Sequence, residues 1–120
     1  MAKLTTAEAR LIQARLRQDG RACDPMTTLA QIGGLTLMSV SGGRWAEITN
    51  HYGEPVGVIL PCGENRAVEV VLNWADLYDI RRIRLVVSGS KRGEVVVEQE
   101  HTDVYCDGLY DLVYTTACWK

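Results

Sequence analysis

The sequence lacks phenylalanine, and it has few prolines, no long apolar run and no large excess of either charge. Three tryptophans and five tyrosines therefore carry all the aromatic volume, and each needs a partner for its N–H or O–H group when buried. No stretch approaches the ~20 apolar residues of a membrane helix, and the first residues lack the apolar core of a secretory signal. These absences predict a soluble, cytoplasmic protein without a membrane partner.

The cysteines show no metal-binding spacing. The four are scattered, with no C-x-x-C pair: Cys23, Cys62, Cys106 and Cys118. Cytoplasmic cysteines are mostly free thiols, and structural zinc sites use closely spaced ligand pairs. We therefore predict no metal and no cofactor, although the four cysteines, with His51 and His101, could still converge in space.

The bulk composition is that of one ordinary globular domain. Of the 120 residues, 47% are hydrophobic and 23% are charged, which argues against disorder. A chain of this length buries roughly two thirds of its unfolded surface, enough for one core. The net charge of −2 exerts no general pull toward nucleic acid. We predict one domain over 1–120, with the N-terminal segment 1–22 as a helix that is either part of it or peripheral.

Two helices are predicted in the N-terminal third. Thr5 and Glu8 have the spacing of a capping box, and apolar residues at helical spacing extend a helix from Thr6 to Asp19. A second helix is predicted to begin at Pro25, because Asp24 is a favourable N-cap residue and proline is favourable at the first helical position. A Gly-Gly pair ends this second, short helix.

From Leu35 onward the pattern favours strands. The predicted extended segments include Leu35–Val40, Trp45–Thr49, Ala67–Trp74 and Glu94–Glu100. The Ser-Gly-Gly-Arg sequence 41–44 predicts a hairpin turn. We predict an α+β fold: two N-terminal helices, a five-stranded antiparallel meander with one face buried and the other partly wet, and a C-terminal helix packed on one sheet face.

The last helix offers a candidate protein interface. It is predicted to begin after Thr102 or Asp103 and to carry an acidic stripe with tyrosines beside it. Tyrosine-rich exposed surface is typical of interfaces, whereas a merely solvated face is the simpler interpretation. The candidate interface residues are Asp107, Tyr110, Asp111 and Tyr114.

Three parts of the chain resemble a group of small proteins encoded by bacteriophages and prophages. They are 29–34 (LAQIGG) running into 37–43 (LMSVSGG), 68–73 (VEVVLN) followed by 76–80 (DLYDI), and Asp103-Val104-Tyr105 with Asp107, Leu109 and Leu112. The chain departs from the group at the 41–44 turn and in its last four residues. The group has no established activity. The resemblance implies a phage origin, a location in the host cytoplasm, and no mechanism.

No catalytic or phosphate-binding motif is present, so we predict a non-enzymatic accessory protein. Its partner would be a host or phage protein, or a second copy of the chain in a homodimer. An alternative partner is nucleic acid, although the net negative charge of the chain disfavours it. The candidate contacts are the residues of the strongest basic concentration: Arg81, Arg82, Arg84, Lys91 and Arg92. The other alternative is a small enzyme or ligand-sequestering protein that uses the region 76–79. Its candidate functional groups are the carboxylates of Asp76 and Asp79.

Overall fold

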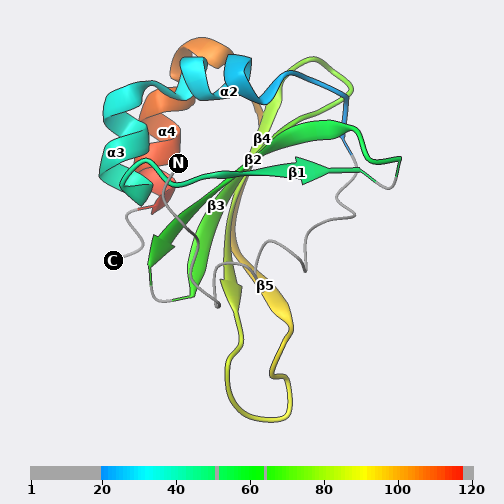
Figure 1. Cartoon of the computed structure of the whole chain (residues 1–120), viewed down its shortest axis with the longest axis vertical. Helices are drawn as coiled ribbons and strands as arrows, with labels where there is room; N and C mark the ends of the chain where they lie inside the picture. The colour runs from blue at the N-terminus through cyan, green and yellow to red at the C-terminus, as the bar shows by residue number, and fades with distance from the viewer. Residues whose placement is uncertain (1–19, 51, 64, 118–120) are drawn as a thin grey trace.

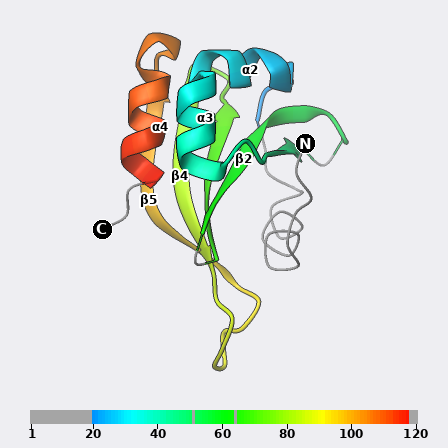
Figure 2. The same ribbon diagram turned by 60° about the vertical axis from the view of Figure 1, so that its left-hand side comes forward.

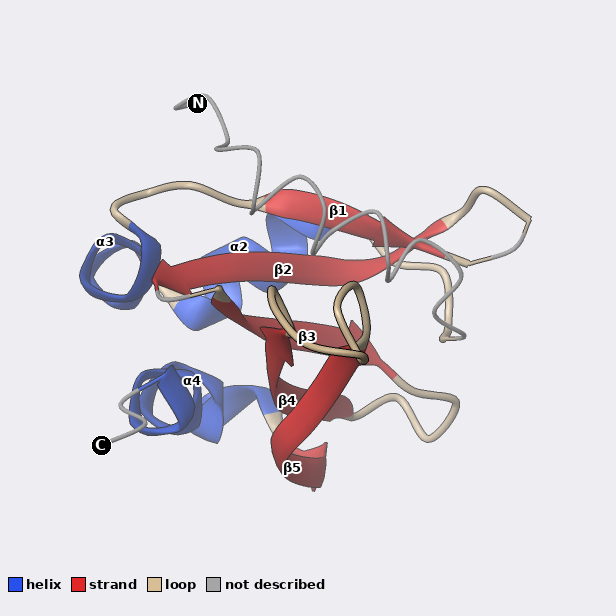
Figure 3. Ribbon diagram, turned by 90° about the horizontal axis from the view of Figure 1, so that it is seen from below, coloured by secondary structure: helices blue, strands red, loops and turns tan. Residues whose placement is uncertain are grey.

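The computed structural model describes residues 20–50, 52–63 and 65–117. They form an antiparallel sheet in the order β1-β2-β3-β4-β5, with helices layered against it (Figures 1 and 3). The strands are β1 (Ala46–Thr49), β2 (Pro55–Gly63), β3 (Arg66–Leu72), β4 (Tyr78–Leu85) and β5 (Val95–Val104). The helices are α2 (Pro25–Ile32), α3 (Gly34–Ser41), the short 3-10 helix η1 (Cys106–Gly108) and α4 (Leu109–Ala117). The predicted α+β fold and five-stranded meander are confirmed, whereas the predicted 6–19 helix lies outside the described residues.

The sheet carries a separate apolar cluster on each face. Val68, Val70 and Ile80 pack with Leu29 of α2 and Leu109 of α4, on the side where Figure 2 shows the helices. Alternation along the strands sends other side chains to the opposite face. That second cluster consists of Ile48, Val56, Ile59, Ala67, Val71, Ile83 and Leu85. Both faces therefore bury aliphatic residues, and the second face is also partly exposed, since the Glu100 side chain that pairs with Arg81 there is 44% exposed.

Helix α2 begins where its sequence predicts. Asp24 is the N-cap, and its Oδ1 accepts a hydrogen bond of 3.0 Å from the backbone N–H of Met26. Pro25 occupies the first helical turn, where the missing N–H costs nothing. The helix ends at Gly33, whose φ of 91° lies in a region that side chains disfavour.

The segment 35–40 is helical, which overturns the predicted strand and hairpin. It lies in α3, and Leu37 and Val40 pack against the first cluster at an i, i+3 spacing. Gly42 is left-handed, with φ of 65°, and its N–H donates to Met38 O at 3.0 Å. The Gly-Gly pair is therefore a helix C-cap and not a hairpin turn. A short apolar run fits both periodicities, and packing against the core decides between them.

The last helix begins later than predicted. Strand β5 continues to Val104, which pairs with Tyr78 of β4, so Thr102 and Asp103 are strand residues. Asp103 has φ of 56° and accepts a hydrogen bond from the Asn73 side chain, which holds the chain end of β5 against the turn between β3 and β4. None of the helices in the described part of the chain is long and apolar enough to cross a membrane.

Candidate functional site

The four candidate interface residues of the C-terminal region are all exposed. Tyr110 and Tyr114 are 56% and 48% exposed, and Asp107 and Asp111 are exposed beside them. They reach the surface because α4 directs its other face, including Leu109 and Val113, into the core. The amphipathic pattern therefore located this surface even though the predicted start of the helix is wrong.

Helix α3 extends this surface with apolar residues. It lies beside α4 (Figure 2), and Thr36 Oγ1 donates to the backbone carbonyl of Tyr110 at 3.4 Å. Leu35 is 88% exposed and Met38 is 62% exposed. The sequence pattern did not indicate either residue as part of a surface, because it predicts a strand for 35–40. Their distinguishing signal is their helical position away from the core-facing Leu37 and Val40.

The helices share an unusual charge pattern. We call α2, α3, η1 and α4, with the residues 25–41 and 105–117, the helical layer. Neither segment contains a lysine or arginine, and the only charged side chains in them are those of Asp107 and Asp111. The layer also holds the exposed large apolar or aromatic residues Met26, Leu35, Met38, Tyr105, Tyr110 and Tyr114.

The five basic candidates for nucleic-acid contact do not form one patch. Arg81 is engaged by acidic groups on one face of the sheet. Its Nη1 lies 3.6 Å from Oε1 of the fully buried Glu69, and its Nε donates to Glu100. The pKa of Arg81 is raised; burial opposes this rise, but the hydrogen bond with Glu100 and the nearby carboxylates outweigh it. Arg81 therefore acts as an ion-pair partner within the sheet.

Arg82 and Arg84 point to the other face and share one carboxylate with Arg66. Glu98 Oε1 accepts from Arg66 Nε at 2.8 Å and from Arg82 Nε at 3.2 Å. Its Oε2 accepts from Arg66 Nη2 at 3.3 Å and from Arg84 Nε at 3.1 Å. We call these four residues the Glu98 cluster. Hydrogen bonding with Arg66 is the main cause that lowers the pKa of Glu98.

The Glu98 cluster joins the sheet to the end of α4. Arg82 Nη1 donates to the carbonyl of Thr116 at 3.2 Å, in the last turn of the helix, where positive charge is favourable. Sequence reasoning missed Arg66, because only the strand register brings it beside Arg84. In this cluster, Arg82 and Arg84 pair with Glu98, and Arg82 also contacts the end of α4.

Lys91 and Arg92 lie apart from the other three, at the tip of the β4–β5 hairpin. The hairpin extends beyond the rest of the sheet (Figure 1), and its loop from 87 to 94 is exposed. Among the described residues, neither basic side chain has an ion-pair partner. These two are the members of the predicted set that are available to an anion.

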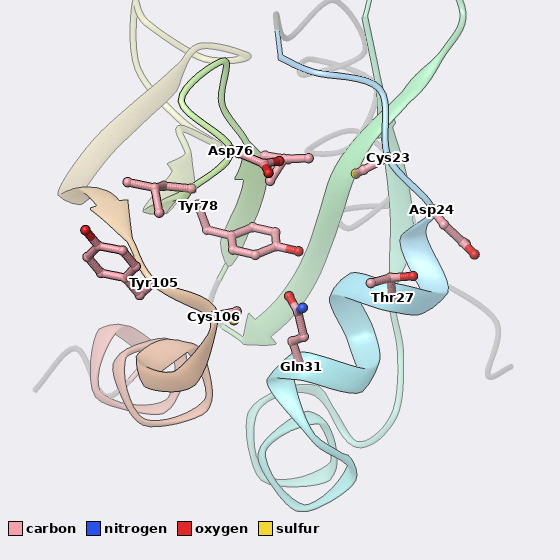
Figure 4. Close-up of a pocket in the computed structure, with 10 residues that line it drawn as sticks. Cys23, Asp24, Thr27, Gln31, Asp76, Tyr78, Tyr105 and Cys106 are labelled. Atoms are coloured by element: carbon pink, nitrogen blue, oxygen red, sulfur yellow. The ribbon is translucent and has the colours of Figure 1, made fainter.

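The 76–79 region lines a pocket of about 370 Å³ (Figure 4). Asp76, Leu77 and Tyr78 form one wall, Cys23 and Gln31 come from the segment leading into α2 and from α2 itself, and Tyr105 and Cys106 come from the junction of β5 and η1. Asp79 does not line the pocket. Its Oδ1 instead accepts hydrogen bonds from Asn73 Nδ2 at 2.9 Å and from the N–H of Asp103 at 3.2 Å.

Asn73 organises the rim of this pocket. Its Oδ1 accepts from the N–H groups of Ala75 at 2.9 Å and Leu77 at 3.1 Å. Its Nδ2 donates to Asp79 and Asp103, at 2.9 Å in both cases. One amide therefore shapes the turn between β3 and β4 and ties it to the end of β5. The resemblance to phage proteins included this Leu-Asn segment, but it did not indicate this role.

Replacing Asn73 with alanine is expected to loosen the turn and to lower the free energy of unfolding by about 2 kcal/mol, since several hydrogen bonds worth roughly 1 kcal/mol each are lost. Asn73→Asp keeps the acceptor for Ala75 and Leu77 but loses both donors. Amide hydrogen exchange at Ala75 and Leu77 should therefore accelerate in Asn73→Ala and much less in Asn73→Asp. Equal protection in all three proteins would contradict this role.

Among the described residues, no hydrogen bond joins the thiols that line the pocket, Cys23 and Cys106, to an imidazole ring. Burial raises the pKa of the Cys23 thiol, which keeps it protonated and poorly nucleophilic at neutral pH. The His101 ring lies on β5 and its Nε2 is 3.0 Å from Gln99 Nε2. Among the described residues, no three His, Cys, Asp or Glu side chains gather closely enough to hold a metal ion. His51 and Cys118 lie outside the described residues.

The fold therefore defines an α+β protein with one helical layer on a five-stranded meander, an exposed aromatic surface and a small pocket. Comparison of the chain with protein-family models, with curated proteins and with solved structures found no match.

Proposed function

We propose that this protein acts without catalysis, by binding another protein through its helical layer. The observation that carries the proposal is the row of exposed apolar and aromatic side chains on α3 and α4, led by Leu35, Tyr110 and Tyr114. Exposed apolar patches on small proteins mark interaction sites, and tyrosine is enriched among residues that dominate binding energy.

The charge of the layer indicates the character of the partner. Its charged side chains are Asp107 and Asp111, and it has no basic residue. A partner surface that presents lysine or arginine around an apolar centre complements it. A second copy of this chain would instead bring like charges together. The resemblance to phage-encoded proteins makes a host protein in the bacterial cytoplasm the first partner to seek.

Affinity purification of the tagged protein from a bacterial lysate tests this proposal. A Leu35→Ser/Tyr110→Ser double variant should lose the specific partner, with affinity for the purified partner falling at least about tenfold. Asp107→Lys/Asp111→Lys should weaken the same complex, and its affinity should no longer fall as salt is raised, because the reversed charges repel a basic partner. Val87→Ser, which alters an exposed apolar residue in the β4–β5 loop, is the control and should bind normally.

Three results would count against the proposal. The recovered proteins could be the same for wild type and layer variants, or the chain could be recovered alone. Analytical ultracentrifugation could instead detect a dimer that the double variant dissociates, in which case the layer binds a second copy. Circular dichroism spectra of all variants establish that they remain folded.

Nucleic-acid binding is a second candidate function, favoured by Lys91 and Arg92 at the tip of an extended hairpin, which have no ion-pair partner in the described part of the chain. A gel shift with duplex DNA should then show affinity that falls with salt, and Lys91→Gln/Arg92→Gln should reduce the slope of log affinity against log salt by about 2. Arg21→Gln, which removes one positive charge at an exposed ion pair with Asp76, is the control outside the hairpin. Affinity that is absent, or unchanged in the double variant, would exclude the hairpin as a nucleic-acid contact.

A further inference from the structure

The pocket beside the β3–β4 turn has a volume suited to a small molecule. The pocket volume of about 370 Å³ lies near the lower end of the range for ligand pockets. Three separate parts of the chain form its walls: the start of α2, the turn between β3 and β4, and the β5–η1 junction (Figure 4). Because the Asn73 hydrogen bonds hold two of these walls together, the cavity is shaped before any ligand arrives.

Gln31 offers the pocket an unused hydrogen-bond acceptor. Its Oε1 is completely buried and has no hydrogen-bond partner among the described residues. Figure 4 shows its amide end pointing from α2 toward the ring of Tyr78. A buried acceptor without a donor is costly, and a ligand that carries N–H groups would satisfy it. The ligand is therefore expected to be a hydrogen-bond donor at this point.

The charges around the pocket favour a cation. Asp24 and Asp76 both line it, and no lysine or arginine does. Arg21 pairs with Asp76, whereas the carboxylate of Asp24 has no basic partner among the described residues. In the described part of the chain, the Asp24 side chain accepts one hydrogen bond, from the N–H of Met26, as the N-cap of α2. An anionic ligand would meet this negative potential, whereas a cationic one is attracted.

The remaining walls are apolar and aromatic. Leu72 and Leu77 line it, as do Tyr78 and Tyr105, whose rings Figure 4 shows. Aromatic rings attract cations at their faces and stack on flat ligands. We propose that this pocket binds a small organic cation, an amine with an aromatic or aliphatic body. The pocket shares Thr27, Gln31, Tyr105 and Cys106 with the helical layer, but it contains none of the residues changed in the protein-binding test, so different variants test the two proposals.

A matched pair of probes tests the charge preference of the full chain. Tyramine and 4-hydroxyphenylacetate share a phenol ring and a two-carbon side arm, but the first ends in an ammonium group and the second in a carboxylate. In an NMR titration, tyramine should shift the amide signals of Gln31, Leu77 and Cys106. Its affinity should exceed that of 4-hydroxyphenylacetate at least tenfold and should fall as salt is raised.

Two variants connect the binding to the named residues. Asp24→Asn removes the charge but keeps an equally good helix cap, so it should weaken tyramine about fivefold, as expected for one charge near the surface, without unfolding α2. Gln31→Leu removes the buried acceptor and should weaken tyramine while leaving the fold intact. The controls Asp111→Asn and Gln99→Leu, both outside the pocket, should bind tyramine as the wild type does.

The proposal is overturned by any of four results. The first is that neither probe binds, and the second is that the two probes bind equally. The third is that Asp24→Asn and Gln31→Leu both retain full affinity for tyramine, and the fourth is that the shifted signals lie outside the pocket. Thermal unfolding of each variant is the check on folding. A Gln31→Leu protein that is more stable but binds tyramine normally would show that the buried oxygen is only a local imperfection.

Discussion

Gly57→Ala is expected to be the most damaging single substitution in the sheet, with a loss of about 3 kcal/mol or more in the free energy of unfolding. A Cβ atom built on Gly57 would lie 2.1 Å from the carbonyl oxygen of Val70 and 2.8 Å from the Cα of Val71. Both are backbone atoms of β3, which pairs with β2 along this stretch. Relief would therefore require the β2–β3 ladder to open, because no side-chain rotation can remove the clash.

Urea denaturation of Gly57→Ala measures this loss, and Gly108→Ala is the matched control. A Cβ at Gly108 would meet no other atom within 4 Å, and its φ is not positive. Since alanine restricts the unfolded chain, Gly108→Ala should be neutral or stabilise by up to about 1 kcal/mol. If both substitutions changed stability equally, close approach of β2 and β3 would not be what requires glycine at position 57.

Glu98→Gln is expected to lower the free energy of unfolding by about 2 kcal/mol. The carboxylate binds three guanidinium groups, and its loss leaves Arg66, Arg82 and Arg84 facing one another with a neutral amide between them. Breaking a buried ion pair costs about 3–5 kcal/mol. The side chains of this cluster are partly exposed, so solvent reduces that cost.

The same cluster predicts a pH dependence of stability. The pKa of Glu98 is below its ordinary value of 4.5 when folded, chiefly because of its hydrogen bond with Arg66. The ion pairs therefore contribute fully above about pH 4.5 and are lost as the pH falls through the lowered pKa. In Glu98→Gln this part of the acid-induced loss should be absent, which a comparison of urea denaturation at pH 7 and pH 3 measures.

The control for Glu98 is Glu100→Gln on the same strand. Glu100 pairs with Arg81, but its side chain is 44% exposed, so its removal should cost less than about 1 kcal/mol. Equal losses in the two variants would mean that the shared carboxylate has no special role. A Glu98→Gln protein as stable as wild type at pH 7 would contradict the prediction outright.

Local patterns were sufficient for several features of the fold and of the candidate surface. Asp24 and Pro25 start α2 because capping chemistry acts within one helical turn. Alternation in β3 places Val68 and Val70 on one face and Val71 on the other, since successive strand residues point to opposite sides. The amphipathic spacing around Tyr110 and Tyr114 likewise indicated that both tyrosines are exposed.

The features that sequence reasoning missed all depend on residues distant in the chain. Leu35 and Met38 became a surface because the 35–40 run is helical, which packing of Leu37 and Val40 against the core determines. Arg66 and Glu98 are 32 positions apart, and only strand pairing brings them together. The pocket acceptor of Gln31 faces residues from two other segments, which no spacing in its own helix indicates.

The amino-acid order was enough to establish the class of fold, the direction in which most strand side chains point and the cap of α2, because these follow from interactions within a few residues. The choice between helix and strand at 35–40, the sharing of Glu98 by three arginines and the cavity beside Asn73 were settled by folding. Each of these depends on contacts between segments far apart in the chain, whose energies local periodicity does not contain.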